Sequence, residues 1–119
     1  MQEEYLDQSL ELASIIQDNF SKKLKRKSRG VKQAGFIVLH QTYMPSVLIE
    51  TGFITNKTEA NFLNSKNGQS KFAKTIAKGI ETYLKQLDIN TVEDLIVGDS
   101  TIYKNITFKV QIASGSTRL

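Results

Sequence analysis

The sequence predicts an α/β domain in which short buried strands are flanked by amphipathic helices. Two apolar runs, at residues 36–39 and 47–50, are short and rich in β-branched side chains, as is typical of strands buried on both faces. Two longer segments, at residues 4–26 and 70–87, instead repeat their apolar side chains every three or four positions. The presence of both patterns in one chain predicts the fold class.

The composition is that of a globular protein and suits one domain or a piece of one. The 119 residues are 39% hydrophobic and 24% charged. No apolar run approaches the ~20 residues that are needed to cross a bilayer. The acids Glu3, Glu4 and Asp7 stand where a signal peptide would have a basic and then an apolar segment. We therefore expect neither a transmembrane segment nor a signal peptide within these residues.

Residues 4–26 are expected to form one amphipathic helix that packs its apolar stripe into the core. Residues 28–30 should end this helix, because Gly30 can take a positive φ. The stripe consists of Leu6, Leu10, Ala13, Ile16, Phe20 and Leu24.

Much of the net charge of +4 gathers around the end of that helix. A solvated helix end explains such a segment, since cations are favourable near a helix C-terminus. The alternative is an anionic ligand, either a cell-wall polymer or nucleic acid. No aromatic residues interleave the charges and no nucleic-acid motif accompanies them, so we expect no nucleic-acid partner. The cations of this basic segment are Lys22, Lys23, Lys25, Arg26, Lys27, Arg29 and Lys32.

Two further helices are expected after the second strand. Asn56 is a typical N-cap with Glu59 at the capping-box spacing, so a short helix should follow and stop at residues 67–68. Ser70 should then cap the longer helix, whose lysines face solvent. Its predicted core face consists of Phe72, Ala73, Ile76, Ala77, Ile80, Tyr83, Leu84 and Leu87.

The end of the chain has a different character. Residues 88–105 lose the apolar periodicity and accumulate Asp, Asn, Thr and Gly, which predicts a linker. Residues 106–112 then alternate strictly between apolar and polar side chains, which predicts a strand.

Glu50 is the candidate catalytic residue. It stands at the carboxyl end of the strand predicted for residues 47–50, where open α/β sheets place their ligands. A carboxylate at this point could equally be solvated, or cap the turn made with Gly52. Position alone does not choose between these interpretations.

The sequence offers no complete zinc site. Cysteine is absent and His40 is the single histidine, whereas a catalytic zinc takes three protein ligands. A histidine in such a position is more often packed or hydrogen-bonded than a ligand. We therefore expect that this chain does not hold a catalytic zinc by itself.

Two motifs, one on each side of His40, resemble a known family. Residues 29–39 read RGVKQAGFIVL and residues 44–56 read MPSVLIETGFITN. In this order and spacing they resemble the C-terminal half of the zinc-dependent N-acetylmuramoyl-L-alanine amidases of bacterial cell walls, the amidase_3 type. The resemblance covers about residues 3–86.

The resemblance implies an α/β fold with a mostly parallel central sheet flanked by helices, of which this chain holds a part. It also implies an exported enzyme of the periplasm or cell envelope, with peptidoglycan as its partner. Such an enzyme cleaves the amide between N-acetylmuramic acid and the L-alanine of the stem peptide. In this family zinc would polarise the carbonyl and acidify a water, and Glu50 would be the general base. The family's His, Glu and His ligands match nothing here, so the zinc ligands are expected in an N-terminal half outside this chain.

The same resemblance divides the chain into three parts. Residues 1–87 would be the C-terminal part of the catalytic domain, residues 88–105 a linker, and residues 106–119 the first strand of a sporulation-related repeat (SPOR-like) domain that binds peptidoglycan. An edge strand of the first domain is the alternative for that last part. For the function, the alternatives are a non-catalytic peptidoglycan-binding or regulatory module on the amidase scaffold, and a basic nucleic-acid-binding domain. The oligomeric state is not indicated.

Overall fold

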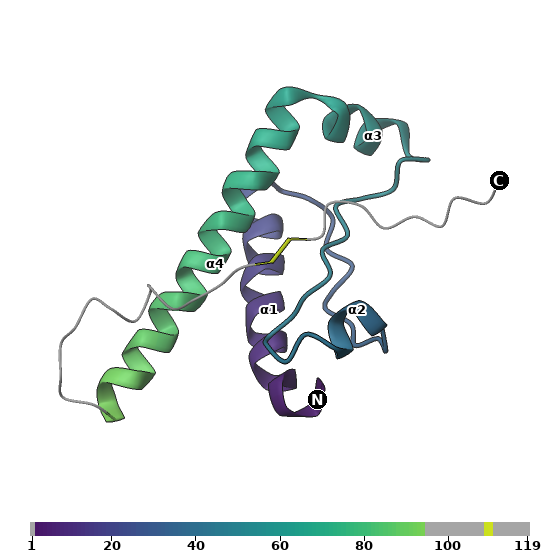
Figure 1. Ribbon diagram of the computed structural model, residues 1–119. Helices are drawn as coiled ribbons and strands as arrows, with labels where there is room; N and C mark the ends of the chain where they lie inside the picture. The colour runs from purple at the N-terminus through teal and green to yellow at the C-terminus, as the bar shows by residue number, and fades with distance from the viewer. Residues whose placement is uncertain (1, 95–108, 111–119) are drawn as a thin grey trace.

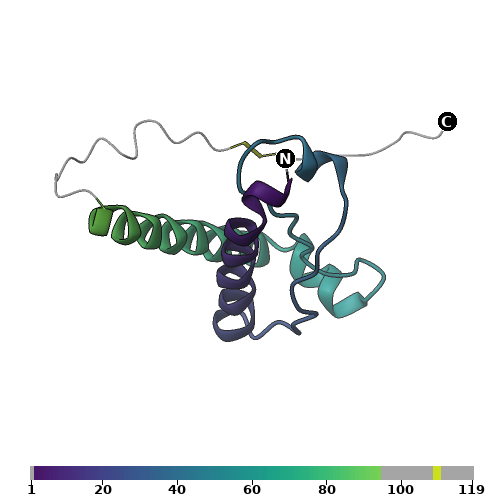
Figure 2. The ribbon, with the colours of Figure 1, turned by 90° about the horizontal axis from the view of Figure 1, so that it is seen from below.

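A computed structural model describes residues 2–94 and 109–110 of the chain. The elements follow one another as η1 (Gln2–Tyr5), α1 (Leu6–Lys23), α2 (Ile37–His40), α3 (Lys57–Asn64) and α4 (Lys66–Asp94). Helix α4 crosses α1, and the long connection that carries α2 lies against another side of α1 (Figure 1; Figure 2). No helix in this described part combines the length and apolar character that a membrane span requires.

The core lies where α1 and α4 cross. Ile16 and Phe20 of α1 and Phe72 of α4 are only 3%, 7% and 5% exposed. The rings of Phe20 and Phe72 meet edge to face with centroids 5.1 Å apart, and Phe62 of α3 makes a second such contact with Phe72 at 5.7 Å. The two predicted amphipathic helices are therefore confirmed, as are the core positions of Ile16, Phe20 and Phe72, but α1 ends at Lys23 and not at residues 28–30.

The buried face of α4 is rotated from the predicted one. Thr75, Gly79 and Tyr83 are buried, whereas Ala73 and Ala77 are exposed. The cause is the close approach of α1 at Gly79, where an added Cβ would lie 2.8 Å from Cγ1 of Ile16. The apolar pattern predicted the face, but the missing side chain of Gly79 decides where the helices touch.

Helix α4 begins at Lys66, before the predicted cap at Ser70. Ser65 is the cap instead: its hydroxyl accepts the N–H of Gly68 at 2.9 Å, and its carbonyl accepts the N–H of Gln69 at 3.0 Å. Helices α3 and α4 are thus separated by this one residue. Gly68 fits the tight corner because a Cβ there would collide with the carbonyl oxygen of Phe62.

The predicted α/β fold with a mostly parallel central sheet is wrong: residues 2–94 and 109–110 include no strand. Residues 36–39 contribute to α2, where the N–H groups of Leu39 and His40 both donate to the carbonyl of Phe36 at 3.0 Å. Residues 47–50 belong to no helix or strand. A strand needs a neighbouring strand to pair its N–H and C=O groups, whereas one helical turn pairs its own. The described chain supplies no such neighbour.

Helix α4 extends into the segment that was predicted as a linker. The helix continues to Asp94, so residues 88–94 are helical. Residues 95–105 and the predicted strand at 106–112 lie outside the described residues, apart from Lys109 and Val110, which are exposed and in no regular element. The division into residues 1–87, 88–105 and 106–119 stays a prediction.

Candidate functional site

Glu50 lies in the segment between α2 and α3, and the start of this segment is anchored on the helices. The N–H of Ser46 donates to the hydroxyl of Ser9 in α1 at 2.9 Å. Val47 and Ile49 pack against the hydrophobic core, while Leu48 is 52% exposed and Glu50 is exposed. This alternation leaves the Glu50 side chain exposed, although residues 47–50 form no strand.

Glu50 lines a groove of about 730 Å³ between α1 and the segment of residues 26–53. Apolar side chains of α1, including Leu10 and Phe20, contribute to its lining. Lys27 and Lys32 of the basic segment lie on the same groove, and both are exposed. The groove therefore combines an apolar wall, a carboxylate that can accept a proton and a positively charged side.

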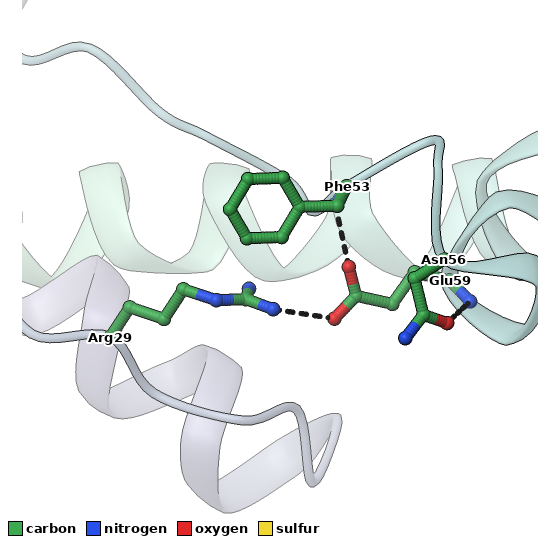
Figure 3. A network of polar contacts seen from close by, with 4 residues as sticks. All are labelled: Arg29, Phe53, Asn56 and Glu59. Atoms are coloured by element: carbon green, nitrogen blue, oxygen red, sulfur yellow. Dashed lines mark hydrogen bonds and ion pairs between the residues drawn. The ribbon is translucent and has the colours of Figure 1, made fainter.

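The peptide that follows Glu50 is held by Arg29 and Glu59 (Figure 3). One carboxylate oxygen of Glu59 accepts the backbone N–H of Phe53 at 2.6 Å, and the other accepts Nη2 of Arg29 at 2.9 Å. The guanidinium of Arg29 also lies over the Phe53 ring, with Cζ 4.5 Å from the centroid. We call Arg29, Phe53 and Glu59 the clamp.

Helix α3 holds the Glu59 side of the clamp. The Asn56 side chain accepts the N–H of Glu59 at 3.1 Å, which confirms Asn56 as the N-cap of α3. The other half of the predicted capping box is not formed. The Glu59 carboxylate is taken up by Arg29 and Phe53, and the N–H of Asn56 donates to the carbonyl of Phe53 at 3.1 Å instead.

Gly52 is required beside the clamp. Its φ of +152° is one that L side chains rarely adopt, and an added Cβ would lie 2.9 Å from the Glu59 oxygen that binds Phe53. A side chain at this position would make Glu59 withdraw from the N–H of Phe53.

The clamp lowers the pKa of the Glu59 carboxyl below its ordinary value of 4.5, first because the N–H of Phe53 donates to it and then because Arg29 does. Since the folded-state pKa is the lower one, the contribution of Glu59 to the free energy of unfolding is complete above about pH 4.5 and is lost as the pH falls through the folded-state value.

We expect the unfolding midpoint in urea to fall as the pH drops below about 4.5. The fall should be smaller in Glu59→Gln, which has no carboxyl to titrate. Glu81, whose pKa is lowered by Lys85 and Lys78, remains in both proteins and contributes to both equally. Urea unfolding followed by circular dichroism between about pH 7 and pH 3 measures the difference. Parallel curves for the parent and the variant would contradict this role of Glu59.

His40, the single histidine, does not share the groove with Glu50. It ends α2 and lines a hollow of about 10 Å³ together with Tyr5 and Thr42, which is room for no more than a water molecule. Within residues 2–94 and 109–110, no three His, Cys, Asp or Glu side chains gather in a way that could hold a metal ion.

Comparison with known proteins decides the family. The sequence profile of the N-acetylmuramoyl-L-alanine amidases (Amidase_3) matches residues 1–82. The chain belongs to this amidase family. The match includes Glu50 and all three residues of the clamp.

Curated proteins give the same result. An uncharacterized protein of Bacillus subtilis, YqiI, is 44% identical over 80 residues, which are 67% of this chain and 39% of that protein. The amidase AmiA of Escherichia coli is 38% identical over 74% of this chain and 30% of its own length, and the amidase LytC of B. subtilis is 40% identical over 65% and 16%. The chain thus spans about a third of the first two relatives and less of the third. No solved structure matches it significantly.

Two residues that line the groove with Glu50 have contacts that the sequence did not predict. Glu59 was predicted only as part of a capping box, and the sequence left Arg29 open between an exposed charge and a cation that neutralises a carboxylate. The sequence did contain a hint of the clamp in the two motifs that carry the family resemblance. Arg29 is the first residue of one motif, and Phe53 lies in the other. Sequence spacing gave no reason to join them, because 30 residues separate Arg29 from Glu59.

Proposed function

We propose that this chain carries the general base of a peptidoglycan amidase and that Glu50 is that base. The observation that supports this most strongly is the amidase family match over residues 1–82. The groove supports it as well, because Glu50 is exposed on it and Lys27 and Lys32 on the same groove suit the carboxylates of stem peptides.

The reaction is hydrolysis of the amide between the lactyl group of N-acetylmuramic acid and the L-alanine of the stem peptide. Glu50 takes a proton from a water molecule as the water oxygen attacks the amide carbon. The C–N bond then breaks, and the proton passes from the Glu50 carboxyl to the leaving nitrogen. The products are a lactyl carboxylate and a free L-alanine amine.

The residues of this chain do not fit the zinc ion that is implied by the family resemblance. The whole sequence contains one histidine and no cysteine, while three protein ligands are usual for catalytic zinc. We propose that the ligands are supplied by a part of the amidase outside these 119 residues.

Titration of the 119-residue chain with zinc tests that assignment. We expect no stoichiometric site with submicromolar affinity and no release of stem peptides, because one imidazole cannot complete a site. Isothermal calorimetry on the parent and on His40→Ala is the measurement, with the variant controlling for weak binding to the single imidazole. A tight site that disappears in His40→Ala would overturn the assignment.

Because the proposed substrate lies in the cell wall, we expect the protein in the cell envelope. In a bacterium with an outer membrane, this means the periplasm. Immunodetection in cell fractions should find it with the envelope fraction. Recovery from the cytoplasmic fraction alone would argue against this location.

The test of the function is digestion of purified peptidoglycan by the amidase that contains this chain. Hydrolysis of the proposed bond exposes L-alanine amines, which dinitrophenyl labelling detects, and leaves glycan reducing ends unchanged. New reducing ends without new amines would indicate cleavage of the glycan strand instead.

The lack of zinc ligands favours one second candidate, a non-catalytic peptidoglycan-binding or regulatory module on the same scaffold. Such a module would pellet with insoluble peptidoglycan but would release no stem peptide. The assay above separates the two candidates.

A further inference from the structure

Two anchors enclose Glu50 in the chain. Upstream, the N–H of Ser46 is bound to Ser9 of α1, and the side chain of Ile49 packs against the core. Downstream, the N–H of Phe53 is bound to the Glu59 carboxylate. Gly52 lies between Glu50 and this second anchor, and glycine leaves the backbone unusually free. Without the bond to Glu59, the turn in which the Phe53 carbonyl accepts the N–H of Asn56 would still hold Phe53, but the Phe53 N–H would lose its anchor on α3.

We propose that Arg29 and Glu59 are positioning residues for Glu50: by clamping the amide and ring of Phe53, they fix the backbone three residues after the carboxylate. This inference rests on the proposed function of Glu50 as the general base. Neither residue is assigned to contact substrate.

The clamp joins two parts of the chain that are far apart in the sequence. Glu59 lies in the first turn of α3, and its own N–H is bound to the N-cap Asn56. Its side chain is 14% exposed, whereas Phe53 at the other end of the bond is 56% exposed. Arg29 comes from the connection that follows α1 and contacts both other members, Glu59 by an ion pair and Phe53 by its guanidinium face.

A purely stabilising role for these contacts is the alternative, and α4 offers a matched control. Glu81 is a helical glutamate too, and its carboxylate likewise has two partners, the ammonium groups of Lys78 and Lys85 at 3.0 Å each. Neither of these two ion pairs involves residues 46–53. Alanine is a good helix former at either position, so Glu59→Ala and Glu81→Ala differ chiefly in the clamp.

The first readout needs no activity. In nitrogen-15 spectra of the 119-residue chain, the Phe53 amide should be shifted downfield and protected from exchange, as a short bond to a carboxylate requires. Glu59→Ala should remove both the shift and the protection at residues 50–53, while Glu81→Ala should change neither. A Phe53 amide that is unchanged in a folded Glu59→Ala chain would overturn the clamp itself.

The second readout is kinetic and uses the amidase that contains this chain. At equal folded fraction, Glu59→Ala should lower kcat about 10- to 100-fold with little change in KM, because small misplacements of a reacting group cost this much. In a plot of kcat against pH, the parent should lose activity more steeply on the acid side than Glu59→Ala does, because protonation of Glu59 breaks the clamp in the parent only. A purely stabilising Glu59 would leave kcat per folded molecule and the shape of the profile unchanged, and that result would overturn the positioning role.

The failure of this inference is distinguishable from failure of the proposed function. A dead Glu50→Gln enzyme with a normal Glu59→Ala enzyme would leave Glu50 as the base and remove the positioning role. A fully active Glu50→Gln enzyme would remove the base, and with it the positioning role, whatever the spectra of Phe53 showed.

Discussion

Glu50→Gln is expected to lower the rate of stem-peptide release by the full amidase about 10²- to 10⁴-fold, the usual cost of losing a general base. Glutamine keeps the size of the side chain and one hydrogen-bonding oxygen, but it cannot take a proton from water at neutral pH. Initial rates of amine release from purified peptidoglycan, corrected for the folded fraction, measure the effect.

Stability should hardly change in this variant. Glu50 is exposed, and exposed substitutions usually alter the free energy of unfolding by no more than ~0.5 kcal/mol. Glu81→Gln, on the outer face of α4, is the matched control and should keep the parent rate. If folded Glu50→Gln protein releases stem peptides close to the parent rate, Glu50 has no part in the proton transfer.

Phe72→Ala should give the largest loss of stability among single substitutions in this chain, about 3–5 kcal/mol in the free energy of unfolding. Phe72 is 5% exposed and holds Phe20 of α1 and Phe62 of α3 against α4 through two edge-to-face contacts. Its removal leaves a cavity where three helices meet, so urea unfolding followed at the helical circular-dichroism band should show a much lower midpoint.

Phe36→Ala is the same chemical change at a residue that is 45% exposed. It should lower the unfolding midpoint far less than Phe72→Ala, because less apolar surface returns to water. Equal losses at the two positions would show that the crossing of α1 and α4 is not the stabilising core.

The helices could be predicted because each carries its own signal. The stripe that includes Ile16 and Phe20 repeats at helical spacing, and Asn56 marks the start of α3 three residues before Glu59. Such patterns depend on residues close in the chain and are read directly. The start of α4 was misplaced because both Ser65 and Ser70 suit a cap, and the packing of Gly68 against Phe62 decides between them.

The prediction of two strands was wrong because it rested on local composition alone. The runs at 36–39 and 47–50 have strand composition, but a strand also needs a partner for its backbone, and composition carries no information about partners. In the described structure the first run forms a helical turn, and only Val47 and Ile49 of the second reach the core.

The candidate site was predicted in part. Glu50 was singled out from its place at the end of an apolar run together with the family resemblance, and it lines the groove with Lys27 and Lys32, but its catalytic role stays a prediction. The clamp was not foreseen, since its ion pair joins residues 29 and 59, which no local pattern connects. Its catalytic consequence stays a proposal until the variants are measured.

The most direct measurement is digestion of a defined muropeptide in water enriched in oxygen-18, followed by mass spectrometry of both products. Hydrolysis of the lactyl amide should place one heavy oxygen in the carboxylate of N-acetylmuramic acid and none in the released peptide, whose new end is an amine. Label found in the peptide or at a sugar anomeric carbon would mean that a different bond is cleaved, and would contradict the proposed function.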